Sequence, residues 1–548
     1  MEVPVGRFIV RYLERLGTEY IFGIPGAHIL PVYDALYYSE IRPVLTKHEQ
    51  GASFMACGYA RQSGKVGVCI ATAGPGATNL VTGLANAYMD RLPILAITGE
   101  TPTYSFGKGA LQESSGEGIC INQVDIFRGI TRHNAIVQRT DYILNQLRTV
   151  TGVLLSQNSG PVLLSFPFNV LKETVEEDLL DSISFTPRYP GLGADPFPAD
   201  EIMVMIKNSH RPVVIAGYGS VLSGAEDSIS RFSSKMNIPV ATSLKARGVL
   251  PESSLRSLGV LGITSNETAF RYISEKADLV IILGASFGER TSYNWNSGLL
   301  KGKKIIQIDN DPSQLNKVFT ADIALNCDVK RAFDLLNERL PDISPKSQEE
   351  VTSYKSSYAN HDVKENEFLL VSYFLRGLND HFGGEVSIFD DNIIYMQRFC
   401  DISKSGSYFP NSGLSSLGHA VPAAIGAKLG TRRPVIALLG DGGFQMCCME
   451  MMTAVNYNIP ITVVLLNNSS LGLVRKNQMY NYGGRFIASD FINPDYRKLA
   501  ESFAINHFRV TSVEDADTVF KTVDFEGGIN LIELILSKNE FPRYSSAR

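Results

Sequence analysis

Short apolar runs alternate with amphipathic segments along most of the chain. The runs are rich in Val, Ile and Leu, and segments between them, such as 76–90 and 443–458, have helical spacing. The runs predicted to be strands are 65–74, 92–99, 211–219, 276–286, 303–309, 433–442 and 459–468. Because apolar strands that alternate with helices are typical of βαβ units, the pattern predicts parallel sheets and an α/β fold. Ligands of such sheets lie beyond the carboxyl ends of the strands.

Two polar stretches divide the chain into three blocks. Residues 172–200 are charged at first and then rich in Pro and Gly, which stop helices and strand ladders. Residues 341–366 are charged and Ser-rich without apolar periodicity, as in a linker. We therefore predict three doubly wound parallel-sheet domains. Their expected ranges are 1–171, 185–340 and 366–548.

Composition narrows the classes of function. Of the 548 residues, 44% are hydrophobic and 20% are charged, as in ordinary soluble globular proteins. There are 51 Lys and Arg against 56 Asp and Glu, and this net charge of −5 argues against a nucleic-acid partner. Seven Cys without spaced pairs favour a reducing cytoplasm over a disulfide framework.

The chain carries no sign of membrane association. Residues 7–16 alternate apolar and charged side chains, which predicts an amphipathic helix rather than a signal peptide. No apolar run approaches the roughly 18 residues that a membrane span needs. We therefore expect a cytoplasmic protein with no membrane partner.

The strongest chemical signal lies in the third block. Gly440, Asp441 and Gly442 follow one strand-like run, and Asn467 and Asn468 follow the next. Since twenty-four residues separate Gly442 from Asn467, one crossover helix fits between them. Asp441 and Asn468 should then end neighbouring parallel strands, beside a helix N-terminus that attracts anions. A carboxylate, an amide oxygen and N–H donors suit Mg²⁺ that bridges a diphosphate. A GDG sequence alone would be better explained as a turn glycine with a capping Asp.

This GDG–X24–NN pattern resembles the diphosphate motif of thiamine diphosphate enzymes. Residues 44–100 are similar to the pyrimidine-binding domain of the acetolactate synthase-like branch of that family. The resemblance covers all three blocks and implies a pyrimidine-binding, a central and a diphosphate-binding domain. It implies thiamine diphosphate and Mg²⁺ as cofactors, with Asp441, Asn468 and Ser470 as metal ligands. The other residues that it implies around the diphosphate are Gly440, Gly442, Gly443, Leu471 and Gly472.

Glu49 is the main catalytic candidate. It stands where a strand-like run gives way to a helix, and on spacing alone it could be an N-cap. The resemblance implies that its carboxyl group hydrogen-bonds N1′ of the aminopyrimidine and promotes the imino tautomer. The 4′-imino group can then take the proton from C2 of the thiazolium, while the protein orients and tunes the cofactor.

The turn 412–420 is expected to bend the cofactor. By position, the resemblance implies that Leu417 props the two rings apart and that the Ser415 carbonyl receives the 4′-amino group. Without the resemblance, a Leu near a helix start would be read as a core residue.

Loops of the first block supply further candidates. His28 follows Pro25 and Gly26, and Gln112 lies in a later loop. A lone His is more often structural, but His28 and Gln112 together resemble the polar pair of benzaldehyde lyase-type enzymes. Such a pair can relay protons at the carbonyl-derived oxygen of the substrate. Gly74 and Asn79 belong to a segment that looks like the loop beside the pyrimidine ring.

The chain also departs from the family pattern. Acetolactate synthases usually carry Gly-Gln-His-Gln within the stretch 390–397, where Ile393 and Ile394 of this chain cannot form the same hydrogen bonds. The family also places a large aromatic side chain near the position of Asn477. Arg247 and Arg290 lie near where flavin-bearing relatives contact FAD, yet salt bridges explain them better. FAD is therefore possible but not favoured.

The resemblance implies a thiamine diphosphate- and Mg²⁺-dependent carboligase or decarboxylase. It would act on a 2-oxo acid such as pyruvate and join the product to a carbonyl acceptor, giving a 2-hydroxy ketone or acetolactate. A 2-hydroxy ketone lyase and a simple 2-oxo acid decarboxylase remain alternatives.

Two other classes are disfavoured. Glu49, Asp441 and Asn468 argue against a non-catalytic protein, and residues 217–224 miss the dinucleotide-binding GxGxxG spacing of an oxidoreductase. We expect a homodimer or homotetramer with active sites at the subunit interface.

Overall fold

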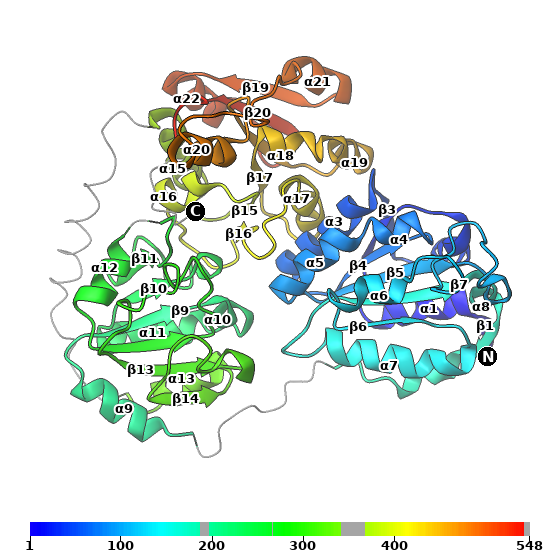
Figure 1. Ribbon diagram of the computed structural model, residues 1–548, viewed down its shortest axis with the longest axis horizontal. Helices are drawn as coiled ribbons and strands as arrows, with labels where there is room; N and C mark the ends of the chain where they lie inside the picture. The colour runs from blue at the N-terminus through cyan, green and yellow to red at the C-terminus, as the bar shows by residue number, and fades with distance from the viewer. Residues whose placement is uncertain (187–196, 266, 341–367, 542–548) are drawn as a thin grey trace.

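Three parallel sheets form the core of the protein. The computed structural model describes residues 1–186, 197–265, 267–340 and 368–541. Each sheet has six strands, and all neighbouring strands in the three sheets pair in parallel. Figure 1 shows them as three lobes, with the N-terminal lobe in blue, the central lobe in green and the C-terminal lobe in yellow to red. The predicted α/β fold with three parallel-sheet domains is confirmed.

The N-terminal sheet has the strand order β3-β2-β4-β5-β7-β6. Its strands are β2 (Tyr20–Gly23), β3 (Arg42–Leu45), β4 (Gly67–Ala71), β5 (Ile94–Glu100), β6 (His133–Ile136) and β7 (Val162–Pro167). Its helices are α1 (Val5–Arg15), α2 (Leu30–Leu36), α3 (Glu49–Ser63), α4 (Pro75–Thr78), α5 (Val81–Asp90), α6 (Gln123–Arg128), α7 (Ile143–Leu154) and α8 (Phe168–Lys172). Helix α1 is the amphipathic helix expected at the N-terminus, and it buries Phe8, Ile9 and Leu13.

Part of the first polar stretch, 172–200, belongs to the N-terminal domain rather than to a linker. Strand β8 (Thr174–Glu176) pairs antiparallel with β1 (Glu2–Pro4), and Leu180 and Ile183 join the apolar core of the N-terminal domain. The expected boundary at residue 171 is therefore too early. The physical reason is that β8 is stabilised by a partner 170 to 174 residues away, which local composition cannot reveal. Residues 187–196 and the second predicted linker, 341–366, lie outside the described residues.

The central sheet has a different strand order, β11-β10-β9-β12-β13-β14. Its strands are β9 (Pro212–Ala216), β10 (Val240–Thr242), β11 (Ser257–Val260), β12 (Leu279–Leu283), β13 (Lys304–Asp309) and β14 (Ile323–Asn326). Its helices are α9 (Ala199–Asn208), α10 (Tyr218–Leu222), α11 (Glu226–Met236), α12 (Thr268–Glu275) and α13 (Val329–Asn337). In chain order this is 3-2-1-4-5-6, the order of dinucleotide-binding folds.

The C-terminal sheet, β16-β15-β17-β18-β20-β19, repeats the order of the N-terminal sheet. Its strands are β15 (Ser387–Asp390), β16 (Tyr408–Pro410), β17 (Val435–Gly440), β18 (Thr462–Asn467), β19 (Asn506–Val510) and β20 (Asn530–Ile535). Its helices are α15 (Leu369–Phe382), α16 (Ile394–Phe399), α17 (Ala420–Leu429), α18 (Asp441–Gln445), α19 (Met451–Tyr457), α20 (Gly472–Asn481), α21 (Tyr496–Phe503) and α22 (Val513–Thr522). In the N-terminal sheet the strand order reverses between β2 and β4, and in the C-terminal sheet it reverses between β15 and β17. Ligands of parallel sheets bind at such switch points.

The segment 443–458 is not the single crossover helix that its periodicity predicts. It consists of the end of α18, a 3₁₀ helix (Cys448–Glu450) and α19. The break falls at Cys447, whose φ of −139° is not helical. After this break, the carboxylate of Glu450 faces the N-terminal domain. It accepts hydrogen bonds from the N–H groups of Lys47 and His48, each at 3.1 Å.

Helices α3 and α17 join the N- and C-terminal domains. A side chain at Gly58 of α3 would start 1.9 Å from the carbonyl oxygen of Ala423, and one at Gly426 of α17 would start 1.9 Å from that of Met55. The two backbones are therefore in direct contact, and the glycines permit it. Within the described part of the chain, no helix is both long and apolar enough to cross a bilayer.

Replacing Gly58 with Ala is expected to destabilise the protein. The added methyl group meets a backbone oxygen that cannot rotate away, so the helices must separate at a cost of about 1–3 kcal/mol or more. The matched control is Gly152→Ala in α7, where nothing lies within 4 Å of the new carbon. That change should stabilise the helix by about 0.5–1 kcal/mol. Urea unfolding of both variants measures the difference, and equal midpoints would contradict the close packing.

Candidate active site

A cavity of about 220 Å³ lies at the carboxyl ends of β15, β17 and β18. This is the switch point of the C-terminal sheet, and all of the lining residues belong to the C-terminal domain. The sequence-predicted residues that line it are Leu417, Gly440, Asp441, Gly442, Gly443, Asn468, Ser470, Leu471 and Gly472. The GDG and NN sequences thus lie side by side, because β17 and β18 are parallel neighbours in the register that pairs Gly440 with Leu466.

Asp441 is the centre of a hydrogen-bond network. Its Oδ2 accepts from the N–H groups of Ser469 (2.6 Å) and Asn468 (3.2 Å) and from Nδ2 of Asn493 (2.8 Å), while Oδ1 accepts from Gly442 N–H (3.0 Å). Burial raises the pKa of Asp441, although these donors favour the charged form. Oδ1, with a single donor, retains lone-pair capacity for a cation.

Asn468 and Ser470 bring two neutral side-chain oxygens to the cavity that Asp441 lines. The Asn468 Oδ1 accepts from the N–H of Ser470 at 3.1 Å. Among the described residues, no group bonds the buried Oγ of Ser470, a residue that lines the cavity. In the same part of the chain, no three His, Cys, Asp or Glu side chains form a metal-binding group. One carboxylate with neutral oxygens is the donor set of a Mg²⁺ that takes its other ligands from phosphate and water, so these residues fit that ion.

The glycines shape the same site as a cradle for an anion. A side chain at Gly442 would start 2.6 Å from Leu471, and one at Gly472 would start 2.9 Å from Asn468. A side chain at either position would therefore require its neighbour to shift. The first N–H groups of α20 have no partner within the helix and can face a diphosphate, so the residues fit such a group.

The turn that carries Ser415 and Leu417 borders the cavity. Ser415 has a φ of +60°, and Leu417 is 37% exposed, unusual for an apolar side chain next to buried elements. Leu417 lines the cavity, so it is not the core residue that its spacing alone suggests.

The stretch that departs from the family also lines the cavity. Ile393, Ile394 and Tyr395 line the cavity with apolar and aromatic surface. From α20, the cavity is lined by Leu473 and Val474, whereas Asn477 is not among its lining residues. Beyond the diphosphate cradle, the site is thus lined largely by apolar side chains.

Glu49 begins α3 in the N-terminal domain. The N-cap is His48, whose Nδ1 accepts from Gln50 N–H at 3.1 Å, so Glu49 is not needed as a cap. The carboxylate of Glu49 is buried, and its Oε2 accepts from Nδ2 of Asn79 at 2.9 Å. The structure thus brings Glu49 and Asn79, two residues predicted from the sequence, within hydrogen-bonding distance.

Pro25, Gly26 and His28 follow β2, and Gly74 and Asn79 follow β4, at the switch point of the N-terminal sheet. Gln112 lies between β5 and α6. Gly26 lies against Thr72, whose Oγ1 donates to Oε1 of Gln112 at 3.4 Å. A side chain at Gly74, whose φ is +58°, would start 3.0 Å from Gln112. His28 is buried in a 3₁₀ helix (Ala27–Ile29), and among the described residues nothing bonds its Nδ1. Pro25 precedes this cluster and is exposed.

One residue of the site, Asn493, has no signal in the sequence. Its Nδ2 donates to Asp441 and, at 2.8 Å, to Oδ1 of Asn467. Its Oδ1 accepts from Nε2 of Gln445 at 2.7 Å and from the Tyr496 hydroxyl at 2.9 Å. Asn493 lies in an irregular loop rather than after a strand, so the rule that ligands bind at strand ends does not point to it.

Arg247 and Arg290 of the central domain both contact the C-terminal domain. Arg247 forms a buried ion pair with Glu252 (2.6 Å) and donates to the carbonyl groups of Met396 (2.9 Å) and Cys400. Arg290 donates to Oδ1 of Asn392 at 2.8 Å. Arg247 thus forms the salt bridge that the sequence suggested, and both arginines make contacts between domains. A separate cavity of about 860 Å³ lies between the three domains. Its lining includes Arg61, Tyr218 and Lys245, whereas Arg247 and Arg290 do not line it.

Comparisons with known proteins agree across the chain. Residues 3–119, 199–336 and 392–534 match the N-terminal TPP binding, central and C-terminal TPP binding domains of thiamine pyrophosphate enzymes. A probable acetolactate synthase large subunit from Methanococcus aeolicus is 32% identical over 94% of this chain and 88% of its own length. The acetolactate synthase large subunit of Lactococcus lactis is 32% identical over 97% and 92%, respectively. The acetolactate synthase of Mycobacterium bovis is 34% identical over 92% and 84%.

Proposed function

Since the chain belongs to the thiamine pyrophosphate (thiamine diphosphate) enzymes, in their acetolactate synthase-like branch, we propose that it is a carboligase that uses pyruvate or a similar 2-oxo acid. The product would be acetolactate or a related 2-hydroxy ketone, depending on the carbonyl acceptor. The observation that carries the proposal is the pairing of Asp441 and Asn468 at one switch point, with a second cluster around Glu49 at the other.

In this proposal the C-terminal residues anchor the cofactor. Asp441, Asn468 and Ser470 would hold Mg²⁺, and the N–H groups around Gly442 and Gly472 would receive the diphosphate. When bound, thiamine diphosphate supplies a carbon nucleophile that attacks the 2-oxo group and stabilises the negative charge left by loss of CO₂. The donors around Asp441 keep its carboxylate in place, so the metal site requires little reorganisation.

The N-terminal residues would control protons. Glu49 would exchange a proton with N1′ of the pyrimidine ring, and Asn79 orients its carboxylate from 2.9 Å. His28 has a free Nδ1 among the described residues, and together with Gln112 it would bind the oxygen derived from the substrate carbonyl. We include no flavin, because Arg247 and Arg290 direct their donors to the C-terminal domain.

The apolar wall supports a second candidate reaction. Ile393 and Ile394 offer no hydrogen bonds to an acceptor carboxylate, which favours an aldehyde over a second 2-oxo acid as the acceptor. The same surface would suit a lyase that cleaves a 2-hydroxy ketone.

The active assembly would be a homodimer or homotetramer. The cavity at Asp441 is lined by the C-terminal domain alone, and the cluster at Glu49 lies in the N-terminal domain. A second copy that supplied its N-terminal domain would enclose both ends of the cofactor and give two equivalent sites.

The test is incubation of the purified protein with thiamine diphosphate, Mg²⁺ and pyruvate, alone and with aldehydes. Carboligation is supported if CO₂ is released together with a product whose mass equals that of the decarboxylated 2-oxo acid joined to the acceptor. Release of CO₂ with free aldehyde would indicate a decarboxylase, and cleavage of an added 2-hydroxy ketone would indicate a lyase. No turnover of any of these substrates would contradict the proposal.

A further inference from the structure

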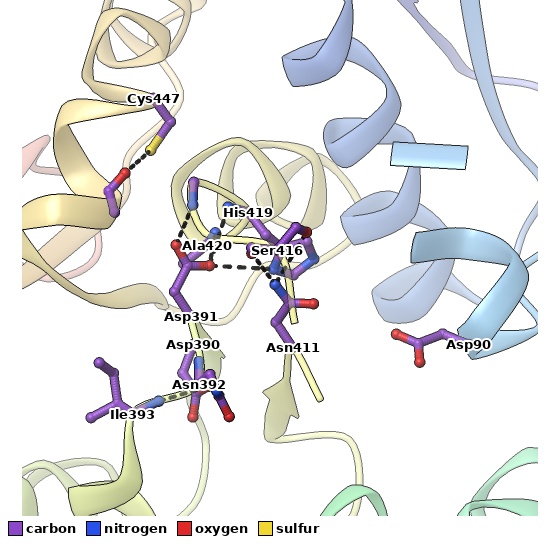
Figure 2. Close-up of polar contacts among 12 residues, drawn as sticks. Asp90, Asp390, Asp391, Asn392, Ile393, Asn411, Ser416, His419, Ala420 and Cys447 are labelled. Atoms are coloured by element: carbon purple, nitrogen blue, oxygen red, sulfur yellow. Dashed lines mark hydrogen bonds and ion pairs between the residues drawn. The ribbon is translucent and has the colours of Figure 1, made fainter. Parts of the chain in front are cut away.

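The carboxylate of Asp391 binds the turn before α17. Asp391 directly follows β15 and is 3% exposed. Its Oδ2 accepts from Gly418 N–H at 2.7 Å, and its Oδ1 accepts from Ala420 N–H at 2.8 Å and His419 N–H at 3.1 Å. Figure 2 shows these contacts between the strand end and the helix start. The N–H groups at a helix N-terminus have no partner within the helix, so one carboxylate satisfies three donors of the turn.

One residue of the turn has an unfavourable backbone conformation. Gly418 has a φ of +81°, which glycine adopts readily, but Ser415 has a φ of +60°, and a left-handed Ser costs conformational free energy. On the other side of the turn, Nδ2 of Asn411 donates to the carbonyl oxygen of Ser416 (Figure 2). Ser415 is therefore flanked by a hydrogen bond from Asn411 on one side and by the bonds to Asp391 on the other.

Asp391 also lies against the loop that carries Asp441. A side chain at Gly443 would start 3.1 Å from Oδ2 of Asp391 and 3.9 Å from Cβ of Leu417. Both Asp391 and Leu417 line the cavity. The carboxylate thus fixes the distance between the turn and the diphosphate cradle.

The N–H groups of the turn stabilise the charged form of the buried Asp391 carboxyl group. Burial raises the pKa of Asp391 to about 7, although the N–H groups of Gly418 and Ala420 favour the charged form. His419, with Nδ1 3.9 Å away, is no counter-ion, because burial lowers its pKa to about 3. A buried carboxylate needs hydrogen-bond donors, and here the donors are those of the turn.

We propose that Asp391 is a positioning residue that holds the Ser415–Leu417 turn over the diphosphate cradle and so sets how strongly the cofactor is bent. The inference rests on the proposed function, in which Leu417 separates the two rings and the Ser415 carbonyl receives the 4′-amino group. It concerns a side chain that the sequence marks only as part of a departure from the family.

The test compares Asp391→Asn with Asp278→Asn. Asp278 of the central domain is a matched control, because it also accepts backbone N–H groups, from His210 at 2.7 Å and Arg211 at 2.8 Å, far from the cavity. Three quantities are measured: amide hydrogen exchange of the peptide 411–424 without cofactor, thiamine diphosphate affinity with Mg²⁺ by calorimetry, and deuterium exchange at C2 of the bound cofactor at saturation. Asp391→Ser, which keeps one acceptor, replaces Asp391→Asn if the latter does not fold.

We expect faster amide exchange in 411–424, affinity lower by about tenfold, and C2 exchange slower by about tenfold in Asp391→Asn, as for the loss of hydrogen bonds to a charged group. The C2 effect should not add to that of Leu417→Ala, since both would act through one turn. Asp278→Asn should change none of these three quantities.

Two outcomes would overturn the inference. If the wild type binds thiamine diphosphate and Asp391→Asn matches it in affinity and C2 exchange, Asp391 does not position the cofactor and the proposed function stands. If the wild type itself shows no Mg²⁺-dependent binding, the proposed function fails and the inference fails with it. Loss of stability with unchanged C2 exchange would count as the first outcome, because a purely structural role does not alter the bound cofactor.

Discussion

Asp441→Ala is expected to abolish Mg²⁺-dependent binding of thiamine diphosphate. The change removes the carboxylate proposed to bind Mg²⁺ and takes one acceptor from four donors, including Nδ2 of Asn493. Mg²⁺ would then be held mainly by phosphate, water and the amide of Asn468. Affinity should fall by at least about a hundredfold, beyond the effect of losing an outer-shell partner. Calorimetric titration with and without Mg²⁺ measures both the affinity and its dependence on the metal.

A matched control in the same domain is Asp495→Ala. Asp495 caps α21 by accepting from the N–H groups of Arg497 and Lys498, yet it does not line the cavity. Losing such a cap costs about 1 kcal/mol of stability and should leave cofactor affinity unchanged. If Asp441→Ala still binds thiamine diphosphate tightly and in a Mg²⁺-dependent manner, the diphosphate site lies elsewhere.

Mixing two inactive variants is expected to restore activity. Glu49→Gln should fold and bind the cofactor but lose most turnover, because an amide cannot exchange a proton with N1′, and Asp441→Ala should not bind it. If each site combines Glu49 of one subunit with Asp441 of the other, a mixed dimer has one intact site out of two. Mixed dimers should therefore show about half of the wild-type rate per dimer.

The mixing experiment needs proof of subunit exchange, for example by two tags of different mass. As a control, two samples of Asp441→Ala with different tags should exchange and remain inactive. Mixed dimers that stay inactive after proven exchange would show that Glu49 and Asp441 do not act across the interface. A monomer that turns over substrate at the full rate would lead to the same conclusion.

Much of the architecture follows from local patterns. Buried parallel strands are continuous apolar runs because both of their faces are covered, so 65–74, 433–442 and 459–468 could be recognised as strands. Asp441 and Asn468 follow such runs at a separation that holds one crossover, and strand ends of a parallel sheet share one edge. Their proximity was therefore predictable. The family resemblance, rather than spacing, singled out Glu49, because a carboxylate at a helix start is usually a cap.

Features that depend on contacts between distant segments could not be read from the chain. The pairing of β8 with β1 extends the N-terminal domain past residue 171, and Glu450 binds Lys47 and His48 across the domain boundary.

The α/β class, the three parallel sheets and the residues that follow their strands could be predicted from the sequence, because hydrophobic periodicity and strand ends are local properties. The bond from Asn493 to Asp441 and the bonds from the Leu417 turn to Asp391 became visible only in the folded chain. Asn493 lies in a loop without periodicity, and the three donors of Asp391 are 27 to 29 residues away. Such contacts depend on how the folded elements pack, and no spacing rule along the chain encodes them.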